Sequence, residues 1–125
     1  MSDKQPPALF PMSQGVLRFA LEIIANIAIG RAAFLWRGWP AVAATVTASL
    51  LAWGVFNVPG DPSRHGHAPV RVPGGVRLAI EAAVFTAGTL GLWRTAQPAW
   101  ALGFAGVILL HYVATWRRVR WILAR

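Results

Sequence analysis

The sequence predicts an all-α membrane protein, a transmembrane four-helix bundle built from two similar helical hairpins with both termini in the cytoplasm. Three observations predict this fold. Of the 125 residues, 56% are hydrophobic and only 13% are charged, whereas about a quarter of the residues in a soluble domain carry charge. Four apolar segments follow one another along the chain, and the arginines are distributed unevenly between the ends of these segments.

The composition also excludes several classes of protein. Cysteine is absent, which excludes disulfides and thiolate metal sites. The formal net charge of +8 is typical of proteins that bind nucleic acids. Here, however, the arginines lie between long apolar runs, and no polar face carries them. We therefore expect the chain to contact the lipid bilayer and not a nucleic acid.

The apolar segments match the length of transmembrane helices, since about 20 residues cross a hydrocarbon layer of roughly 30 Å. Proline in the first helical turn is tolerated, which fits Pro40 and Pro98. A flexible N-terminal tail (1–13) precedes the single transmembrane domain (14–116), and a basic interfacial tail (117–125) follows it. The expected helices are 14–34, 40–58, 76–93 and 98–116, with a loop over 59–75 that opens with the turn signal Pro59-Gly60-Asp61-Pro62.

The arginines and the lysine predict the orientation. With four spans, both termini and the loop 59–75 share one side of the membrane. That side receives nine cations, while the other side receives only Arg31, Arg37 and Arg94. Because the cytoplasmic side carries the excess of Lys and Arg, we expect the cell (inner) membrane with both termini in the cytoplasm.

The two halves of the chain resemble each other. Arg18-Phe19-Ala20-Leu21-Glu22 matches Arg77-Leu78-Ala79-Ile80-Glu81, which begins 59 residues later. Each half contributes two helices, so the halves keep the same orientation in the membrane and form a parallel repeat. The recurring Arg-x-x-x-Glu motif is the strongest support for this repeat, because apolar helices resemble one another by chance.

Charged and polar side chains inside a span need an explanation, because a charge in the membrane costs roughly 2.5 to 3.5 kcal/mol. Most of them lie toward the cytoplasmic side of the predicted helices. They form a candidate polar intramembrane cluster for binding a ligand or coupling a proton: Arg18, Glu22, Asn26, Asn57, Arg77, Glu81, His111 and Thr115.

This cluster has a structural and a functional interpretation. Arg and Glu four residues apart share a helix face. Crossed pairs, Arg18 with Glu81 and Arg77 with Glu22, would fix how the two hairpins dock, and removing one partner would leave an uncompensated charge. Alternatively, one glutamate is a protonatable coupling site, or the cluster binds a polar head group.

Other candidate sites are weaker. The pair His65 and His67 lies in the loop with Asp61 as its nearest acid, which makes a poor metal site. No second span carries a haem ligand to match His111, so we expect neither a metal nor a cofactor. The end of the chain is basic and amphipathic and suits anionic head groups; its lipid-interface residues are Arg117, Arg118, Arg120 and Trp121.

Three motifs resemble the YrdB family of small bacterial membrane proteins. They are the two Arg-x-x-x-Glu helix starts and the Trp53-Gly54-Val55-Phe56-Asn57-Val58-Pro59 element. The resemblance covers about residues 15–116 and implies four spans and an unknown function. The loop 59–75 and the basic tail are longer than the resemblance leads us to expect.

Three classes of function follow. A binding or accessory subunit ranks first, with the Arg/Glu pairs as scaffolding, and a homodimer or a membrane complex as the assembly. A dimeric transporter of small solutes or protons that uses Glu22 and Glu81 ranks second. A membrane enzyme that acts on a lipid or isoprenoid ranks third, because no catalytic set of residues is evident.

Overall fold

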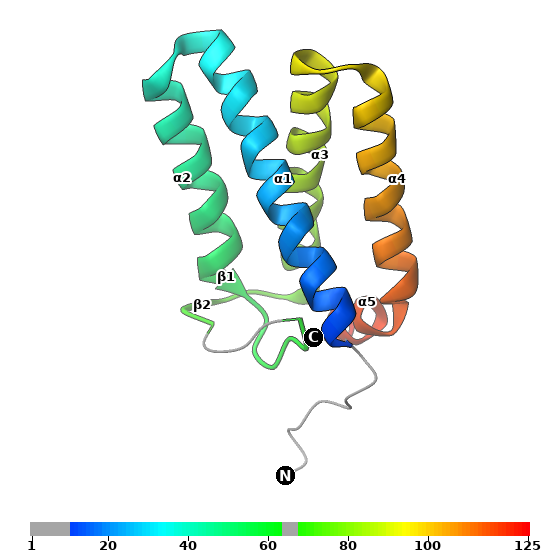
Figure 1. Cartoon of the computed structure of the whole chain (residues 1–125). Helices are drawn as coiled ribbons and strands as arrows, with labels where there is room; N and C mark the ends of the chain where they lie inside the picture. Colours follow the sequence, from blue (N-terminus) through cyan, green and yellow to red (C-terminus); the bar gives the residue numbers. More distant parts are fainter. Residues whose placement is uncertain (1–10, 64–67) are drawn as a thin grey trace.

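The computed structural model describes residues 11–63 and 68–125 and is all-α apart from one pair of short strands (Figure 1). The two strands pair in parallel, with Phe56 opposite Val70 and Asn57 opposite Arg71. In chain order the elements are α1 (Met12–Arg37), α2 (Trp39–Val55), β1 (Phe56–Asn57), β2 (Val70–Arg71), α3 (Gly74–Thr95), α4 (Pro98–Ala114) and α5 (Trp116–Leu123).

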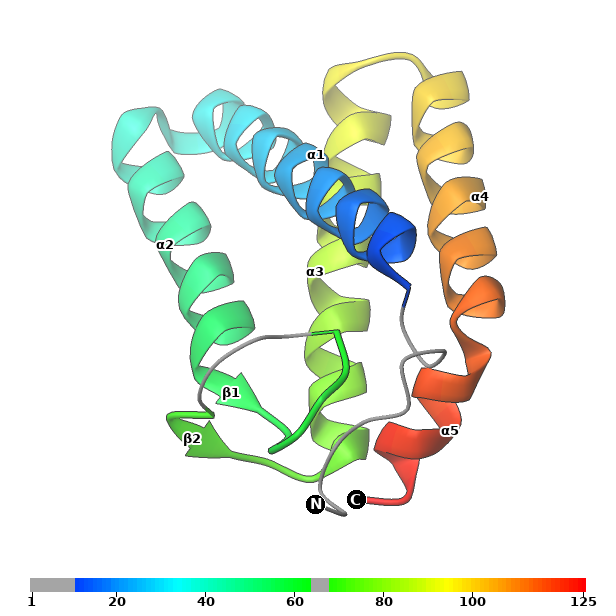
Figure 2. The same ribbon diagram turned by 60° about the horizontal axis from the view of Figure 1, so that its bottom comes forward.

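The helices form two hairpins that pack through their first members. α1 and α3 contact each other, α2 packs on α1, and α4 packs on α3. The start of α1, the strand pair, α5 and the C-terminus lie together at one end of the molecule, which we call the base (Figures 1 and 2). The α1–α2 and α3–α4 connections lie at the other end, the turn end.

Small residues bring the backbones of α1 and α3 close together. A Cβ atom on Gly88 would lie 2.8 Å from the Cα of Ala25, and one on Gly91 would lie 2.6 Å from the carbonyl oxygen of Ala28. Such small-residue contacts let helices approach closely where lipid removes the hydrophobic drive for packing. Beside this seam lies the apolar core, formed by Leu21, Ala25, Trp53, Val84, Phe85, Phe104 and Ile108.

The outer surface is largely apolar. On α4 alone, Leu109, Leu110 and Val113 are 66 to 70% exposed. Soluble proteins rarely expose large contiguous apolar surface. By length and composition, α1 and α3 can each cross a membrane, whereas α2 is a shorter apolar helix. α4 and α5 pass the same test only when joined, and they are bent by 70° at Thr115.

Several boundaries differ from the expected ones. The second helix ends at Val55 and not at residue 58, because Phe56 and Asn57 turn into an extended strand that pairs with β2. α1 and α3 begin earlier than expected, directly after Pro11 and Pro73, whose extended backbone precedes the first helical turn. The expected tail 117–125 is mostly helix α5. Pro40 and Pro98 do lie in first turns, as predicted.

Candidate functional site: an ion network at the base

The carboxylate of Glu81 lies buried at the base and receives three guanidinium groups from three helices. Arg77 precedes it by one turn of α3, and its Nε donates to Oε2 over 2.9 Å. Arg18 of α1 places Nη2 2.6 Å from the same oxygen as an ion pair. Arg118 of α5 donates from Nη2 to Oε2 over 2.8 Å. All four side chains are 3% exposed or less.

The second oxygen of Glu81 is also satisfied. The hydroxyl of Tyr112, on α4, donates to Oε1 over 2.6 Å, and Nη1 of Arg118 donates to it over 3.2 Å. Glu81 therefore contacts α1, α4 and α5 as well as its own helix. Charge-assisted hydrogen bonds of this kind are stronger than neutral ones.

Arg118 is shared with a second buried carboxylate, that of Asp61 in the segment after β1. Its Nε and Nη2 donate to Oδ1 and Oδ2 of Asp61 over 2.9 and 2.7 Å, a bidentate pair. The backbone N–H and the hydroxyl of Ser63 also donate to Oδ1. This pair attaches the segment after β1 to α5. We call Arg18, Asp61, Arg77, Glu81 and Arg118 the base network.

The pKa values of Asp61 and Arg118 shift in the directions expected for a buried ion pair. Burial by itself raises the pKa of Asp61, but the hydrogen bonds and charge of Arg118 outweigh it, and the pKa lies below its usual value. Burial likewise lowers the pKa of Arg118, but Asp61 and Glu81 together raise it above its usual value. Both groups are therefore charged at neutral pH.

Arg18 and Arg77 also contact Trp53, and Arg77 bonds to the end of α2. The guanidinium carbons of Arg18 and Arg77 lie 4.9 and 4.8 Å from the centroid of the Trp53 ring, within the range of cation–π attraction. Nη1 of Arg77 donates to the carbonyl oxygens of Trp53 and Phe56 over 2.7 and 2.9 Å. A cation at the carboxyl end of a helix is favoured by the helix dipole.

Glu22 lies at the edge of this arrangement. Its Oε2 is 4.0 Å from Nε of Arg18, and its side chain is 24% exposed. With Glu22 included, three arginines face three carboxylates, and the formal charge of the site is balanced. Of the two hypothesised crossed pairs, Arg18 with Glu81 is formed, whereas Arg77 bonds to Glu81 of its own helix.

The other predicted cluster residues bond to groups other than the carboxylate of Glu81. Asn26 donates to the carbonyl oxygen of Glu22, and buried Asn57 donates to the carbonyl oxygen of Gly54 at the end of α2. Nδ1 of His111 is 2.9 Å from Oε1 of Gln14, and Thr115 donates back to the carbonyl oxygen of His111. Asn26 and Thr115 therefore bond to the backbone of the preceding turn and Asn57 to the end of α2, whereas His111 links α4 to α1.

The predicted lipid-interface set divides by helical face. Arg117 and Arg120 are exposed. Trp121 is half-buried, and its ring lies under the guanidinium of Arg125. The prediction for Arg118 is wrong, because this side chain is fully buried against Asp61 and Glu81. Successive residues of a helix point about 100° apart, so Arg118 faces the buried carboxylates while Arg117 and Arg120 face outward.

Sequence reasoning missed Asp61 and Tyr112 as partners of this site. Both carried a signal, since Asp61 is one of four acidic residues and Tyr112 is the single tyrosine. Within residues 11–63 and 68–125, no three His, Asp or Glu side chains gather in a way that suits a metal ion. The pair His65 and His67 lies outside the described residues.

Comparison with known proteins places this chain among relatives without an assigned activity. Residues 16–109 match the family described as "Protein of unknown function (DUF2568)". The chain is 35% identical over 112 residues to the "Uncharacterized protein YrdB" of Bacillus subtilis (strain 168), which covers 86% of this chain and 91% of the relative. No solved structure matches the chain. The chain therefore belongs to the DUF2568 family of proteins of unknown function, and the match to YrdB confirms the resemblance that its motifs indicated.

Proposed function

We propose that this chain is a four-span protein of the cell membrane, with both termini in the cytoplasm, that serves as a binding or accessory subunit. In this proposal the base network docks the two hairpins and carries no substrate. One observation supports it above all: Glu81 is buried among three arginines and Tyr112, which occupy both of its oxygens. A carboxylate so occupied suits scaffolding better than proton coupling.

The arrangement of the helices supports four spans in one domain covering residues 14–116. α2 and α4 run beside α1 and α3, and at 17 residues each they extend about 25 Å. The two hairpins also support the proposed internal repeat, because the matched residues Arg18 and Arg77 reach the same carboxylate and lie beside the same tryptophan.

The proposed orientation places the base in the cytoplasm. α5 lies there with Arg117 and Arg120 exposed, which suits anionic head groups. Arg31, Arg37 and Arg94 lie toward the turn end of α1 and α3, on the opposite side of the membrane. Exposed Trp36, Trp39, Trp93 and Trp100 lie near them, at the depth where aromatic side chains gather.

Single-cysteine accessibility tests this topology, because the natural chain has no cysteine. We expect a membrane-impermeant maleimide to label Gln97→Cys, at the turn end, in intact cells. Arg125→Cys, at the base, is expected to react only after the cells are permeabilised. Labelling of Arg125→Cys in intact cells would contradict the proposed orientation, and labelling of both positions would contradict a spanning arrangement.

Native mass spectrometry from mild detergent tests the accessory role. We expect the chain to retain a membrane partner or a lipid at fixed stoichiometry. A chain released alone, with neither, would contradict a binding or accessory role. The transport alternative would replace it if a reconstituted dimer moved protons or a solute and lost that flux in Glu22→Gln, since Glu22 is the partly exposed glutamate.

A further inference from the structure

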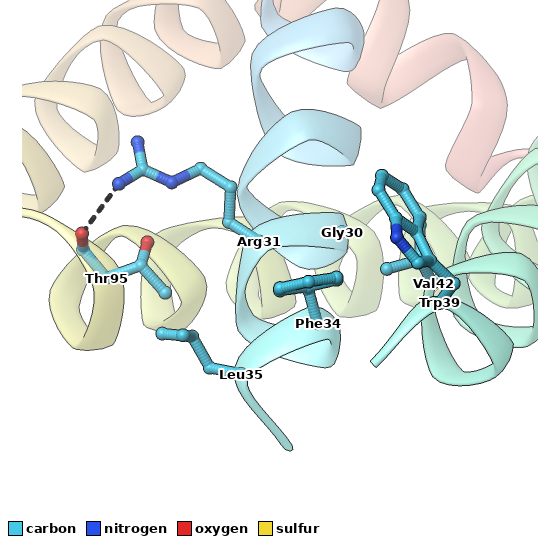
Figure 3. A pocket seen from close by; sticks show the side chains of 7 residues that line it. All are labelled: Gly30, Arg31, Phe34, Leu35, Trp39, Val42 and Thr95. Atoms are coloured by element: carbon cyan, nitrogen blue, oxygen red, sulfur yellow. Dashed lines mark hydrogen bonds between the residues drawn. The ribbon is translucent and has the colours of Figure 1, made fainter. Parts of the chain in front are cut away.

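A pocket of about 380 Å³ opens at the turn end, between the carboxyl ends of α1 and α3 and the start of α2. Its size falls within the range of about 300 to 1,000 Å³ that is typical of sites for small ligands. Figure 3 shows Arg31 and Thr95 on one side, Trp39 and Val42 on the other, and Phe34 between them. Most of the lining side chains are apolar, so the pocket suits a hydrocarbon chain better than a water-soluble ion.

Arg31 is the charged group of this pocket. Its Nη2 donates to the carbonyl oxygen of Thr95 over 2.8 Å, at the end of α3 (Figure 3). This bond uses one of the five N–H donors of the guanidinium and orients the group at the rim. Arg31 is exposed, so its remaining donors can reach a bound molecule.

Positive charge at this end has no acidic counterpart among the described residues. Arg37 and Arg94 stand in the last turns of α1 and α3 and add to the charge of Arg31. Of the described acidic residues, Asp61 and Glu81 belong to the base network, and Glu22 lies about 13 Å along α1 from Arg31. An anionic molecule would therefore complement this end of the protein.

We propose that this pocket binds an anionic phospholipid of the membrane leaflet at the turn end, with its phosphate on Arg31 and one acyl chain along Phe34, Trp39 and Val42. Arginine recognises phosphate through paired hydrogen bonds. Tryptophan suits the boundary between head groups and chains, since its ring is apolar and its N–H is polar. The inference rests on the membrane placement proposed above, but it concerns a site separate from the base network.

Lipid retention by the full chain in detergent tests the proposal. Native mass spectrometry would compare phosphatidylglycerol with phosphatidylcholine of the same chains, offered at equal concentration. We expect about a fivefold preference for phosphatidylglycerol, because the positive choline group beside the phosphate of phosphatidylcholine weakens its attraction to Arg31, by about as much as one partly exposed ion pair contributes. Arg31→Gln is expected to abolish this preference. Arg37→Gln is the matched control, because it removes the same charge from the same end outside the pocket, and it is expected to keep the preference.

Three outcomes would overturn the inference. Equal retention of the two lipids by the natural chain would mean that the pocket does not select anions. If Arg31→Gln and Arg37→Gln lost the preference for phosphatidylglycerol equally, the net charge of the turn end would select the lipid, and not a site at Arg31. A dimer that excludes lipid would assign the pocket to a second copy of the chain. Each outcome leaves the proposed topology intact, because cysteine accessibility at Gln97 and Arg125 tests the topology independently.

Discussion

At the scale of single residues, Glu81 balances the charge of three buried arginines. We expect Glu81→Gln to destabilise the protein by about 3 to 5 kcal/mol, because breaking a buried ion pair leaves uncompensated charge. The measurement is the unfolding midpoint in detergent, together with the yield of monodisperse protein in size-exclusion chromatography. A well-folded Glu81→Gln variant would show that this carboxylate is not structural.

Glu22→Gln is the matched control for that variant, since it is the same change one helix away. Glu22 is 24% exposed and stands 4.0 Å from Arg18. Such peripheral ion pairs contribute about 0 to 1 kcal/mol, so we expect a small effect on the unfolding midpoint. An equal fall in the unfolding midpoint of the two variants would contradict this expectation. It would mean that Glu22 stabilises the arginines as strongly as Glu81 does.

Asp61 gives the base network a dependence on pH. Its pKa is lower in the folded protein than its usual value, so the ionised form stabilises the fold above the unfolded pKa of about 3.9. That contribution is lost as the pH falls through the lower, folded pKa. We therefore expect Asp61→Asn to be less stable than the natural protein at pH 7, and the difference in unfolding midpoint to shrink below about pH 4. A constant difference between pH 7 and pH 3 would contradict this role of Asp61.

At the scale of helices, the seam between α1 and α3 depends on glycine. A Cβ on Gly88 would lie 2.8 Å from both the Cα and the Cβ of Ala25, so Gly88→Ala forces the two backbones apart. We expect a loss of about 1 to 3 kcal/mol, as for overpacked cores, measured as a lower unfolding midpoint.

Gly103→Ala on α4 is the matched control, because nothing lies within 4 Å of a Cβ at that position. Alanine is also the better helix former. We expect Gly103→Ala to be neutral or stabilising. If both alanine variants lost the same stability, the cause would be the helix backbone and not the α1–α3 contact.

The ends of the elements show what apolar patterning leaves open. The prolines and the apolar runs were enough to predict that Pro40 and Pro98 lie in the first turns of helices. They did not predict β1, because Phe56 and Asn57 leave the helix to pair with Val70 and Arg71, which are distant in sequence. α5 was not predicted as a helix packed on the protein, because it buries the charged side chain of Arg118. A pattern of apolar residues places a charged side chain at the surface.

The base network, likewise, was predictable only in part. The cost of charge inside a span singled out Arg18, Arg77 and Glu81, which the structure brings together. Asp61 and Arg118 were not identified as part of it, because they are 57 residues apart and meet only when the segment after β1 and α5 pack at the base. Neither residue carries a local pattern that names its partner. Contacts between distant segments of this kind follow from the packing of the whole chain.

At the scale of the whole molecule, non-covalent contacts join the first half of the chain to the second half. The first half supplies Arg18, Asp61 and the carbonyl oxygen of Trp53; the second half supplies their partners Glu81, Arg118 and Arg77. The seam of Ala25 and Ala28 against Gly88 and Gly91 crosses the same boundary. The covalent connection is therefore not the only link between the halves.

Co-expression of residues 1–65 and 66–125 as separate chains tests this conclusion. We expect the two fragments to co-purify in mild detergent at equal stoichiometry, because the ion pairs and the small-residue seam survive the cut. Glu81→Gln in the second fragment removes the ion pair with Arg18, so recovery of the first fragment is expected to fall several-fold. Glu22→Gln in the first fragment, at the edge of the site, is expected to leave recovery nearly unchanged. Fragments that purify separately would mean that the loop, and not the base network, keeps the hairpins together.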